Sequence, residues 1–390
     1  MADRKDNQVL KKITRQIYAN RPQMPESMRT HYRIERANGG LLCDLWFLTK
    51  GCIHDAEGGC TMCNYGKASQ SLYQEKVLKE LQHIVKKLYW EFEDFLLTPS
   101  GSMLDEREVP DEMRGRLKEL LKDVKTKRFI IETRADTVNE NGLHFLQEIL
   151  PGSEKYVEIG YESGSNWILR NCINKGTSAE DFEHAAALIH KSEIKVTANI
   201  AVGIPFLSER ASILEAISSV KRAFAQGADS VVIFPYHVKH GTLLEVMYQK
   251  GWYNCISLWS LVAVLEGIPQ DMLDKVQISW YKDYFGEARS QIFASPSTCG
   301  KCGQDVIELL DCYRQDPSPE KLDTLRSYDC QCKQEWKEHL ETQEPGIDLG
   351  KVEVQYRQLA KEFEVKEEVL EEELLIMKKT LRGKDDADES

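Results

Sequence analysis

The sequence predicts an α/β fold built around a parallel sheet. From residue 41 to about residue 240 the chain alternates between short β-rich runs and helical stretches. Six such runs occur, each followed by a helix or a loop, which is typical of parallel strands joined by helical crossovers. Six units fit either an open doubly wound sheet or a curved, incomplete barrel. In both, ligands bind at the carboxyl ends of the strands.

The expected elements follow in order along the chain. A short amphipathic helix over residues 8–19 ends before Pro22. Residues 41–48 are apolar and lie between glycines, as in a buried strand, and the next strand, 93–98, stops at Pro99. The other expected strands are 128–133, 156–161, 195–202 and 230–235, with helical stretches at 71–88, 110–125, 138–149, 178–191 and 209–226.

After residue 241 the pattern changes. Helical segments rich in Trp and Leu cover 242–266, a cysteine-rich region covers 296–340, and a charged helix is expected over 351–379, with a disordered tail from Gly383. We therefore expect four regions: an N-terminal helical extension (1–40), the sheet domain (41–240), a C-terminal helical domain with a cysteine-rich metal site (241–345), and a charged helix with a disordered tail (346–390).

Composition narrows the class of protein. The chain has 390 residues and a net charge of −12, which argues against binding nucleic acid by bulk electrostatics. Residues 1–36 nevertheless carry nine Lys or Arg against four acids, so they form either a local basic face or a solvated helix. With no apolar run of membrane-spanning length and no secretory signal, we expect a cytoplasmic protein without membrane contact.

Three of the 11 cysteines, Cys52, Cys60 and Cys63, lie in the loop after the first expected parallel strand. Their spacing is C-x7-C-x2-C, and three thiols without an obvious fourth ligand fit a [4Fe–4S] cluster with one open iron. Zinc is an alternative, because structural zinc takes four ligands and His54 would complete them. The third interpretation is an accidental clustering of structural thiols.

A second group of cysteines lies near the C-terminus. Two close pairs of thiols suit a closed tetrahedral site, which is typical of structural zinc. A second iron–sulfur cluster and unligated thiols are the alternatives, and Cys312 could replace one member. The four expected ligands are Cys299, Cys302, Cys330 and Cys332.

The first cysteine group resembles that of the radical S-adenosylmethionine (SAM) superfamily. That family carries three cysteines after the first strand of a partial barrel, with an apolar or aromatic residue before the last, here Met62. Its usual spacing has a shorter first gap. The resemblance implies a partial (β/α)6 radical SAM barrel with a C-terminal helical, cysteine-rich extension. It also implies a [4Fe–4S] cluster, SAM bound to the open iron, a reductant such as flavodoxin or ferredoxin, and a 5′-deoxyadenosyl radical that abstracts hydrogen from a substrate.

Later strand ends extend the resemblance. A Gly-rich turn follows the second strand, a polar residue ends the third, and an E-x-G-x-E-S pattern ends the fourth, in the order that the family uses. A glycine after a strand is usually only a turn, and Glu132 and Arg134 could simply pair with each other. The cofactor-binding residues that the resemblance implies are Met62, Tyr65, Gly101, Ser102, Glu132, Arg134, Glu162 and Gly203.

Residues 25–342 resemble more closely the radical SAM subunit of archaeosine synthase. That family shares the C-x7-C-x2-C spacing and a final C-x-C followed by Trp, here Trp336. The resemblance implies carbon–nitrogen cleavage in a lysine-bearing 7-deazaguanine of tRNA, with tRNA contacts supplied by a partner subunit. Phe234 and Lys239 depart from the Asn and Gln expected there, so fold and SAM chemistry carry over better than substrate. Candidate substrate contacts are His237, Lys239 and His240, with a solvated basic loop as the alternative.

Three functions follow. The first is a radical SAM enzyme, of lyase or oxidoreductase type, acting on an amine-bearing or modified-nucleoside substrate. The second is a radical SAM enzyme acting on a small molecule in natural-product or cofactor biosynthesis. The third is a zinc-stabilised, non-catalytic scaffold, against which the open three-cysteine loop argues.

Overall fold

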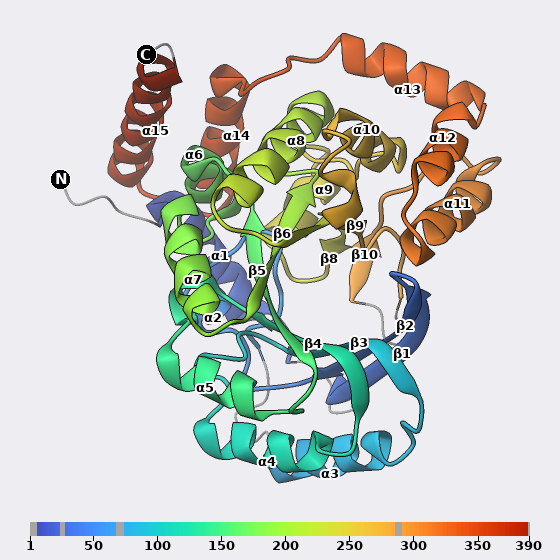
Figure 1. Cartoon of the computed structure of the whole chain (residues 1–390). Helices are drawn as coiled ribbons and strands as arrows, with labels where there is room; N and C mark the ends of the chain where they lie inside the picture. The colour runs from blue at the N-terminus through green and yellow to red at the C-terminus, as the bar shows by residue number, and fades with distance from the viewer. Residues whose placement is uncertain (1–5, 24–27, 68–73, 285–290, 389–390) are drawn as a thin grey trace.

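The computed structural model describes residues 6–23, 28–67, 74–284 and 291–388. Its centre is a curled eight-stranded sheet in the order β1-β2-β3-β4-β5-β6-β7-β9 (Figure 1). From β2 to β9 all neighbours are parallel, and β1 pairs antiparallel with β2 at one edge. The strands are β1 Thr30–Ala37, β2 Gly40–Phe47, β3 Glu91–Pro99, β4 Lys125–Thr133, β5 Glu154–Glu162, β6 Lys195–Val202, β7 Ser230–Pro235 and β9 Val276–Ile278.

The six expected strands are β2 to β7, so the predicted partial barrel is confirmed. Helices cover the outer face of the curl (Figure 1). They form because apolar residues recur on one face and caps fix their ends; in α7, Ser178 and Asp181 make a reciprocal capping box. The covering helices are α3 Gln74–Val85, α4 Asp111–Leu121, α5 Glu140–Glu148, α7 Ala179–Lys191, α8 Glu209–Ala225 and α10 Trp259–Gly267.

Strand alternation separates a core face from a cavity face. In β4, Phe129 and Ile131 are fully buried against the helices, whereas the alternate residue Glu132 lines the interior of the curl. In β5, Val157 is likewise in the core and Glu158 lines the interior. The barrel therefore presents polar side chains inward.

Two strands were not expected. β1 lies inside the region predicted as a helical extension, and β9 adds to the sheet from the region predicted as helical. β1 reads Thr-His-Tyr-Arg-Ile-Glu-Arg-Ala and is an edge strand, so it lacks the apolar run that marks a buried strand. β9 has only three residues, too few for a periodic signal.

The C-terminal part is mostly helical. The expected stretch 242–266 is two helices, α9 Leu243–Gln249 and α10, and a two-stranded sheet pairs β8 Val238–Lys239 with β10 Ile292–Ala294. The single charged helix expected over 351–379 is also two helices, α14 Leu349–Glu362 and α15 Glu367–Asp388, because Glu364 takes a φ of 51° between them. α15 continues to Asp388, past the expected start of disorder, and residues 389–390 lie outside the described residues.

The remaining helical elements connect these parts. α1 packs against α14 and α15, so the two ends of the chain lie on the same side of the molecule (Figure 1). Within the described ranges, no helix combines the length and apolar character needed to cross a membrane. These elements are α1 Gln8–Asn20, α2 Ile53–Ala56, η2 Ala135–Thr137, α6 Asn166–Ile168, η3 Leu169–Ile173, η4 Leu273–Lys275, α11 Gly303–Gln315, α12 Pro319–Ser327 and α13 Gln331–Glu341.

Candidate active site

A cavity of about 330 Å³ fills the inside of the curled sheet. Its walls are the inward side chains of the strands, and the loop that follows β2 contributes to its lining. The structure thus brings together residues that the sequence analysis selected separately from five strand ends. The predicted residues that line it are Cys52, Cys60, Met62, Cys63, Tyr65, Gly101, Glu132, Arg134, Glu162, His237 and Lys239.

The cysteine loop is tied to the N-terminal helix. Arg21, directly after α1, pairs with the buried Asp55 at 2.6 Å between Nη1 and Oδ2, and its Nη2 donates to the carbonyl of Cys63 at 3.1 Å. Asp55 also accepts the amide of Gly66 at 2.6 Å. Loss of either member of this pair would leave the other charge buried and unpaired, so the loop depends on both residues. The end of α1 is therefore part of the scaffold of the site.

Asn174 holds the other side of the loop. Its side-chain nitrogen donates to the carbonyls of Gly58 at 2.8 Å and Gly59 at 3.0 Å. Its own carbonyl lies 3.0 Å from Nε2 of His54. His54 is therefore used to anchor the loop, which argues against the alternative in which it completes a zinc site.

The three loop thiols do not form a compact single-ion site among the described residues. Among the described residues, the group of Cys, His, Asp or Glu whose ligand atoms all lie within 4.8 Å of one another is the C-terminal one, and the loop thiols form no such group. A tetrahedral ion with Zn–S bonds of about 2.3 Å needs sulfurs about 3.8 Å apart. The wider spacing fits a multi-iron cluster.

Each loop thiol has a cation beside it. Burial raises the pKa of Cys60 to about 11 and that of Cys63 to about 12, and in each case a neighbouring lysine opposes the rise. Burial also raises the pKa of Cys52, where an arginine opposes it. These cations favour thiolates over thiols, as a metal-binding loop requires. The pairs are Cys52 with Arg134, Cys60 with Lys175, and Cys63 with Lys239.

Arg134 does not pair with Glu132 but with two other acidic residues, Glu108 and Asp105. Its guanidinium lies 2.7 Å from Glu108 and 2.9 Å from Asp105, and Nη1 lies 3.5 Å from Sγ of Cys52. The Glu108 side chain is completely buried and also accepts the amide of Ile53 at 2.9 Å. Glu108 therefore joins the arginine to the cysteine loop, a role that no sequence motif indicated.

Glu162 lies in a buried network with two residues that the sequence analysis did not select as site residues. Lys175 Nζ lies 2.9 Å from Oε1 of Glu162, and the hydroxyl of Tyr236 donates to Oε2 at 2.8 Å. Gly160 leaves space for this pair, since a Cβ at that position would lie 2.6 Å from Lys175 Nζ and would displace it. Glu162 itself takes a left-handed φ of 64° at a bulge, which turns its carboxylate toward the lysine.

Three predicted residues do not line the cavity. Ser102 is fully buried, and its hydroxyl bonds those of Thr133 and Thr137 at 2.5 and 2.6 Å. Gly203 takes a φ of 86°, and its carbonyl accepts the hydroxyl of Tyr253 at 2.8 Å. His240 is exposed and bonds Glu245 at 3.0 Å. Ser102 and Gly203 therefore make contacts that support the strand ends and do not face the cavity.

The two predicted substrate contacts that do line the cavity are both partnered. Lys239 Nζ lies 3.0 Å from the hydroxyl of Tyr65 and 4.3 Å from the centre of its ring. His237 bonds Ser295 and the carbonyl of Trp280, and burial lowers its pKa to about 4. His237 is therefore neutral near pH 7, and Lys239 supplies the positive charge on this wall.

Glu132 and Glu158 form an acidic pair inside the curl. They are direct neighbours in the register of β4 and β5, and among the described residues neither carboxylate makes a hydrogen bond or ion pair. Burial raises the pKa of Glu132 to about 7 and raises that of Glu158 well above its usual value, with Asp44 adding to both. Nearby, Thr98 Oγ1 and Asn199 Oδ1 are buried without a described partner. This wall is therefore rich in acceptors.

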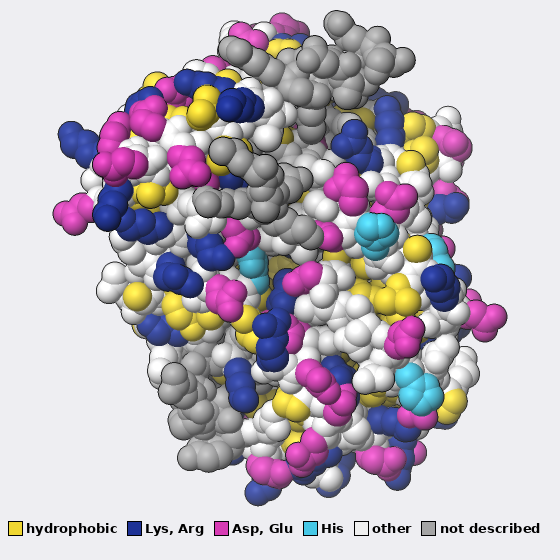
Figure 2. All heavy atoms as spheres, turned by 90° about the vertical axis from the view of Figure 1, so that its left-hand side faces the viewer, with side chains coloured by type: hydrophobic (Ala, Val, Ile, Leu, Met, Phe, Trp, Pro, Cys, Tyr) yellow, Lys and Arg dark blue, Asp and Glu magenta, His cyan; other side chains and the backbone are white. Residues whose placement is uncertain are grey.

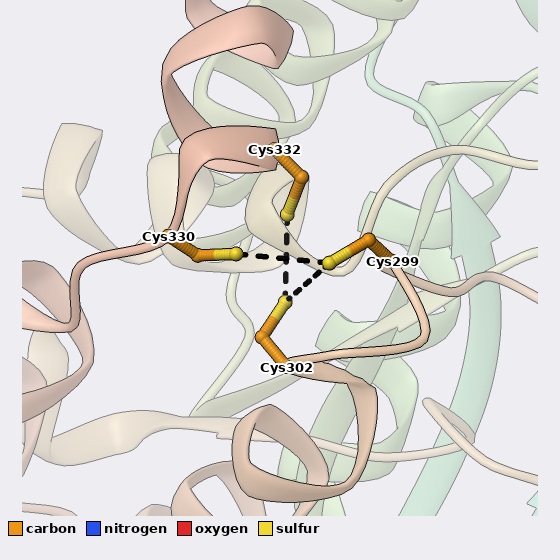
Figure 3. A group of neighbouring side chains, drawn as sticks. All are labelled: Cys299, Cys302, Cys330 and Cys332. Atoms are coloured by element: carbon orange, nitrogen blue, oxygen red, sulfur yellow. Dashed lines mark hydrogen bonds between the residues drawn. The ribbon is translucent and has the colours of Figure 1, made fainter.

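The second cysteine group lies apart from this cavity. Cys299, Cys302, Cys330 and Cys332 converge on one point at the start of α11 and α13, as Figure 3 shows. Cys312, the predicted replacement, is exposed on α11 and is not part of the group.

No protein-family model matches the chain. Archaeosine synthase subunit beta of Methanosarcina acetivorans is 32% identical over 303 residues, which are 76% of this chain and 84% of that protein. The subunit of the same name in Thermococcus kodakarensis is 31% identical over 223 residues, 56% of this chain and 68% of that protein.

Among solved structures, an N-terminally truncated Elp3 of Methanocaldococcus infernus superposes with a TM-score of 0.46 at 21% identity, covering 62% of this chain and 58% of that one. The degree and extent of the sequence identity to the Methanosarcina protein settle the family. The chain belongs to the family of archaeosine synthase subunit beta.

Proposed function

We propose that this radical SAM family member holds a [4Fe–4S] cluster on Cys52, Cys60 and Cys63 and cleaves a carbon–nitrogen bond in the amine-bearing arm of a modified nucleoside of tRNA. The observation that carries the proposal is the position of three thiols on the lining of one cavity, without the compact spacing of a single-ion site. When bound, such a cluster supplies the electron that cleaves SAM reductively.

The residues around the loop suit the binding of SAM. Gly101 leaves room next to the cysteine loop, since a Cβ there would lie 3.5 Å from Cα of Cys52 and would strike the Glu108 carboxylate. Arg134 offers a cation for the carboxylate of methionine, fixed in place by Glu108 and Asp105. Met62 and Tyr65 add apolar surface on the same wall.

The acidic pair suits an amine. Burial and the neighbouring Glu132 carboxylate raise the pKa of Glu158, and a substrate ammonium placed between the two carboxylates would remove that penalty. The unpartnered acceptors of Thr98 and Asn199 would take further N–H groups. We therefore assign the cationic end of the substrate arm to Glu132 and Glu158.

A partner subunit would supply most of the contacts to tRNA. On the face that Figure 2 shows, Lys and Arg side chains are interspersed with Asp and Glu, without a broad area of one sign among the described residues. The net charge of −12 agrees with this. An enzyme acting on a free small molecule is the second candidate, favoured by Phe234, which lines the cavity where the tRNA-modifying relatives are expected to carry a polar residue.

The test is anaerobic reconstitution with iron and sulfide, followed by SAM, dithionite, and either tRNA with a lysine-bearing 7-deazaguanine or the free modified nucleoside. We expect 5′-deoxyadenosine to form in step with loss of the lysine arm from the tRNA. Turnover of the free nucleoside alone would overturn the assignment to tRNA. Failure to assemble a cluster, or a cluster that persists in Cys60→Ala, would overturn the site itself.

A further inference from the structure

The four C-terminal cysteines have the geometry of a closed metal site. Neighbouring sulfurs lie 3.5 Å apart between Cys299 and Cys302, 3.6 Å between Cys299 and Cys330, and 3.4 Å between Cys302 and Cys332. All four sulfurs lie within 4.8 Å of one another, and Figure 3 shows them pointing at a common centre. A tetrahedral ion with metal–sulfur bonds of about 2.3 Å requires edges of about 3.8 Å.

The same distances exclude an iron–sulfur cluster at this place. In a cluster, several irons and sulfides lie between the cysteine sulfurs, so that thiolates on different irons are held well apart. Here no pair of the four is separated by more than 4.8 Å, which leaves room for a single ion. The two cysteine groups of this chain therefore differ in the kind of metal centre that they fit.

The local structure is built to present thiolates. Cys302 is the N-cap of α11, Cys330 is the N-cap of α13, and Cys332 lies in the first turn of α13. Two helix N-termini thus face the four sulfurs, and their dipoles favour negative charge there. The indole nitrogen of Trp259 lies 3.5 Å from Sγ of Cys332 and supplies a further donor.

The site joins segments from different parts of the fold. Trp259 belongs to α10, which packs on α8, and Trp336 of α13 donates to Glu209 at the start of α8 at 3.1 Å. α11 runs from Cys302 to the cavity itself, because Arg314 near its end lines the cavity and pairs with Glu35 at 2.8 Å. A metal at the start of α11 would therefore fix a helix whose other end contributes to the interior wall.

We propose that Cys299, Cys302, Cys330 and Cys332 bind one zinc ion that anchors α11 and α13 to the barrel, independently of the iron–sulfur cluster and of the substrate. Zinc fits because four thiolates at tetrahedral spacing, without an open position, form a structural site rather than a catalytic one.

The test separates the two centres in the full chain. A variant with Cys52, Cys60 and Cys63 all changed to Ala is purified, and its metals are measured by mass spectrometry. We expect about one zinc ion per chain, the stoichiometry of one closed four-thiolate site, and no bound iron. The zinc content should fall at least tenfold in the same background with Cys302→Ser and stay unchanged with Cys312→Ser, the exposed cysteine on the same helix. Retained iron and sulfide, or no metal at all, would overturn the proposal.

A second measurement covers the case in which Cys302→Ser does not fold. Cobalt replaces zinc in the triple variant, and its thiolate charge-transfer absorption reports how many sulfurs bind it. Cys299→His should keep the metal, since three cysteines and one histidine also form a structural site, and should reduce this absorption by about a quarter. An unchanged spectrum would show that Cys299 is not a ligand and would overturn the four-cysteine assignment.

Discussion

The two cysteine groups of this chain contain the same residue type in opposite arrangements. The loop thiols at Cys52, Cys60 and Cys63 are three in number, do not form a compact group, and line a cavity, with a cation beside each. The C-terminal thiols are four in number, closely spaced, and closed. The number and separation of the sulfurs, rather than the presence of cysteine, distinguish a centre that can bind a further molecule from one that holds the fold.

The largest expected effect comes from breaking the open group. Cys60→Ala should abolish cluster assembly and reduce 5′-deoxyadenosine formation to background, because the cluster loses one of only three protein ligands. Iron and sulfide content and product yield measure this. The fold should persist, because the loop is also held by Arg21 and Asn174. Cys312→Ala is the matched control and should behave as wild type.

Breaking the closed group should instead reduce the stability of the fold and leave the loop cluster in place. Cys302→Ser should mainly lower the free energy of unfolding, by several kcal/mol, since the binding free energy of a structural zinc site contributes directly to folding. The melting temperature measures this, with iron content of the loop cluster as the comparison. Full stability together with lost activity would contradict the contrast and favour a second redox centre.

This contrast was only partly accessible from the sequence. Close pairs of cysteines marked both groups, and apolar runs marked β2 to β7, because both signals are local. Glu108, whose buried carboxylate joins Arg134 to the loop, carried no signal, since its partners come from three separate segments. The pairing of Arg21 with Asp55 crosses 34 positions and depends on how α1 docks.

Two predicted residues show a second limit. Ser102 and Gly203 follow the expected strands but do not line the cavity, because alternation fixes the side that a residue faces within a strand and not in the turn that follows it. Within the strands, alternation held: Glu132 and Glu158 both point inward. The sequence therefore located strand ends better than it located the side chains that follow them.

The acidic pair offers a prediction of intermediate size in which stability and activity move in opposite directions. Glu158→Gln removes the negative charge of a half-buried carboxylate without a described partner and should raise the unfolding free energy at pH 8 by about 1–3 kcal/mol, the usual desolvation cost of a group left without a partner. The pKa of Glu158 is raised in the folded chain, so the penalty is absent below the unfolded pKa of about 4.3 and grows as the pH rises above it. The gain should therefore shrink toward pH 4. Urea unfolding at both pH values measures it.

The same variant should bind an amine-bearing substrate less well. Loss of one charged hydrogen bond, worth about 1.5–3 kcal/mol, predicts a KM for the lysine-bearing tRNA about 10- to 100-fold higher. Glu154→Gln, an exposed residue on the same strand, is the control and should change neither quantity. An unchanged KM in Glu158→Gln would remove the acidic pair from substrate binding.

The smallest expected effect comes from the contact between Tyr65 of the cysteine loop and Lys239 of the opposite cavity wall. Tyr65→Phe removes the hydrogen bond from Lys239 Nζ at 3.0 Å but keeps the ring, whose centre lies 4.3 Å from the same nitrogen. A hydrogen bond from a charged donor is worth at least about 1.5 kcal/mol, and the ring that remains still faces the ammonium, so turnover should fall by about tenfold with cluster content unchanged. Lys239→Met should cost more, because it also removes the cation beside Cys63. If Tyr65→Phe instead lost iron, the hydroxyl would be holding the cysteine loop itself rather than orienting the lysine, and the two walls of the cavity would be coupled through the metal centre.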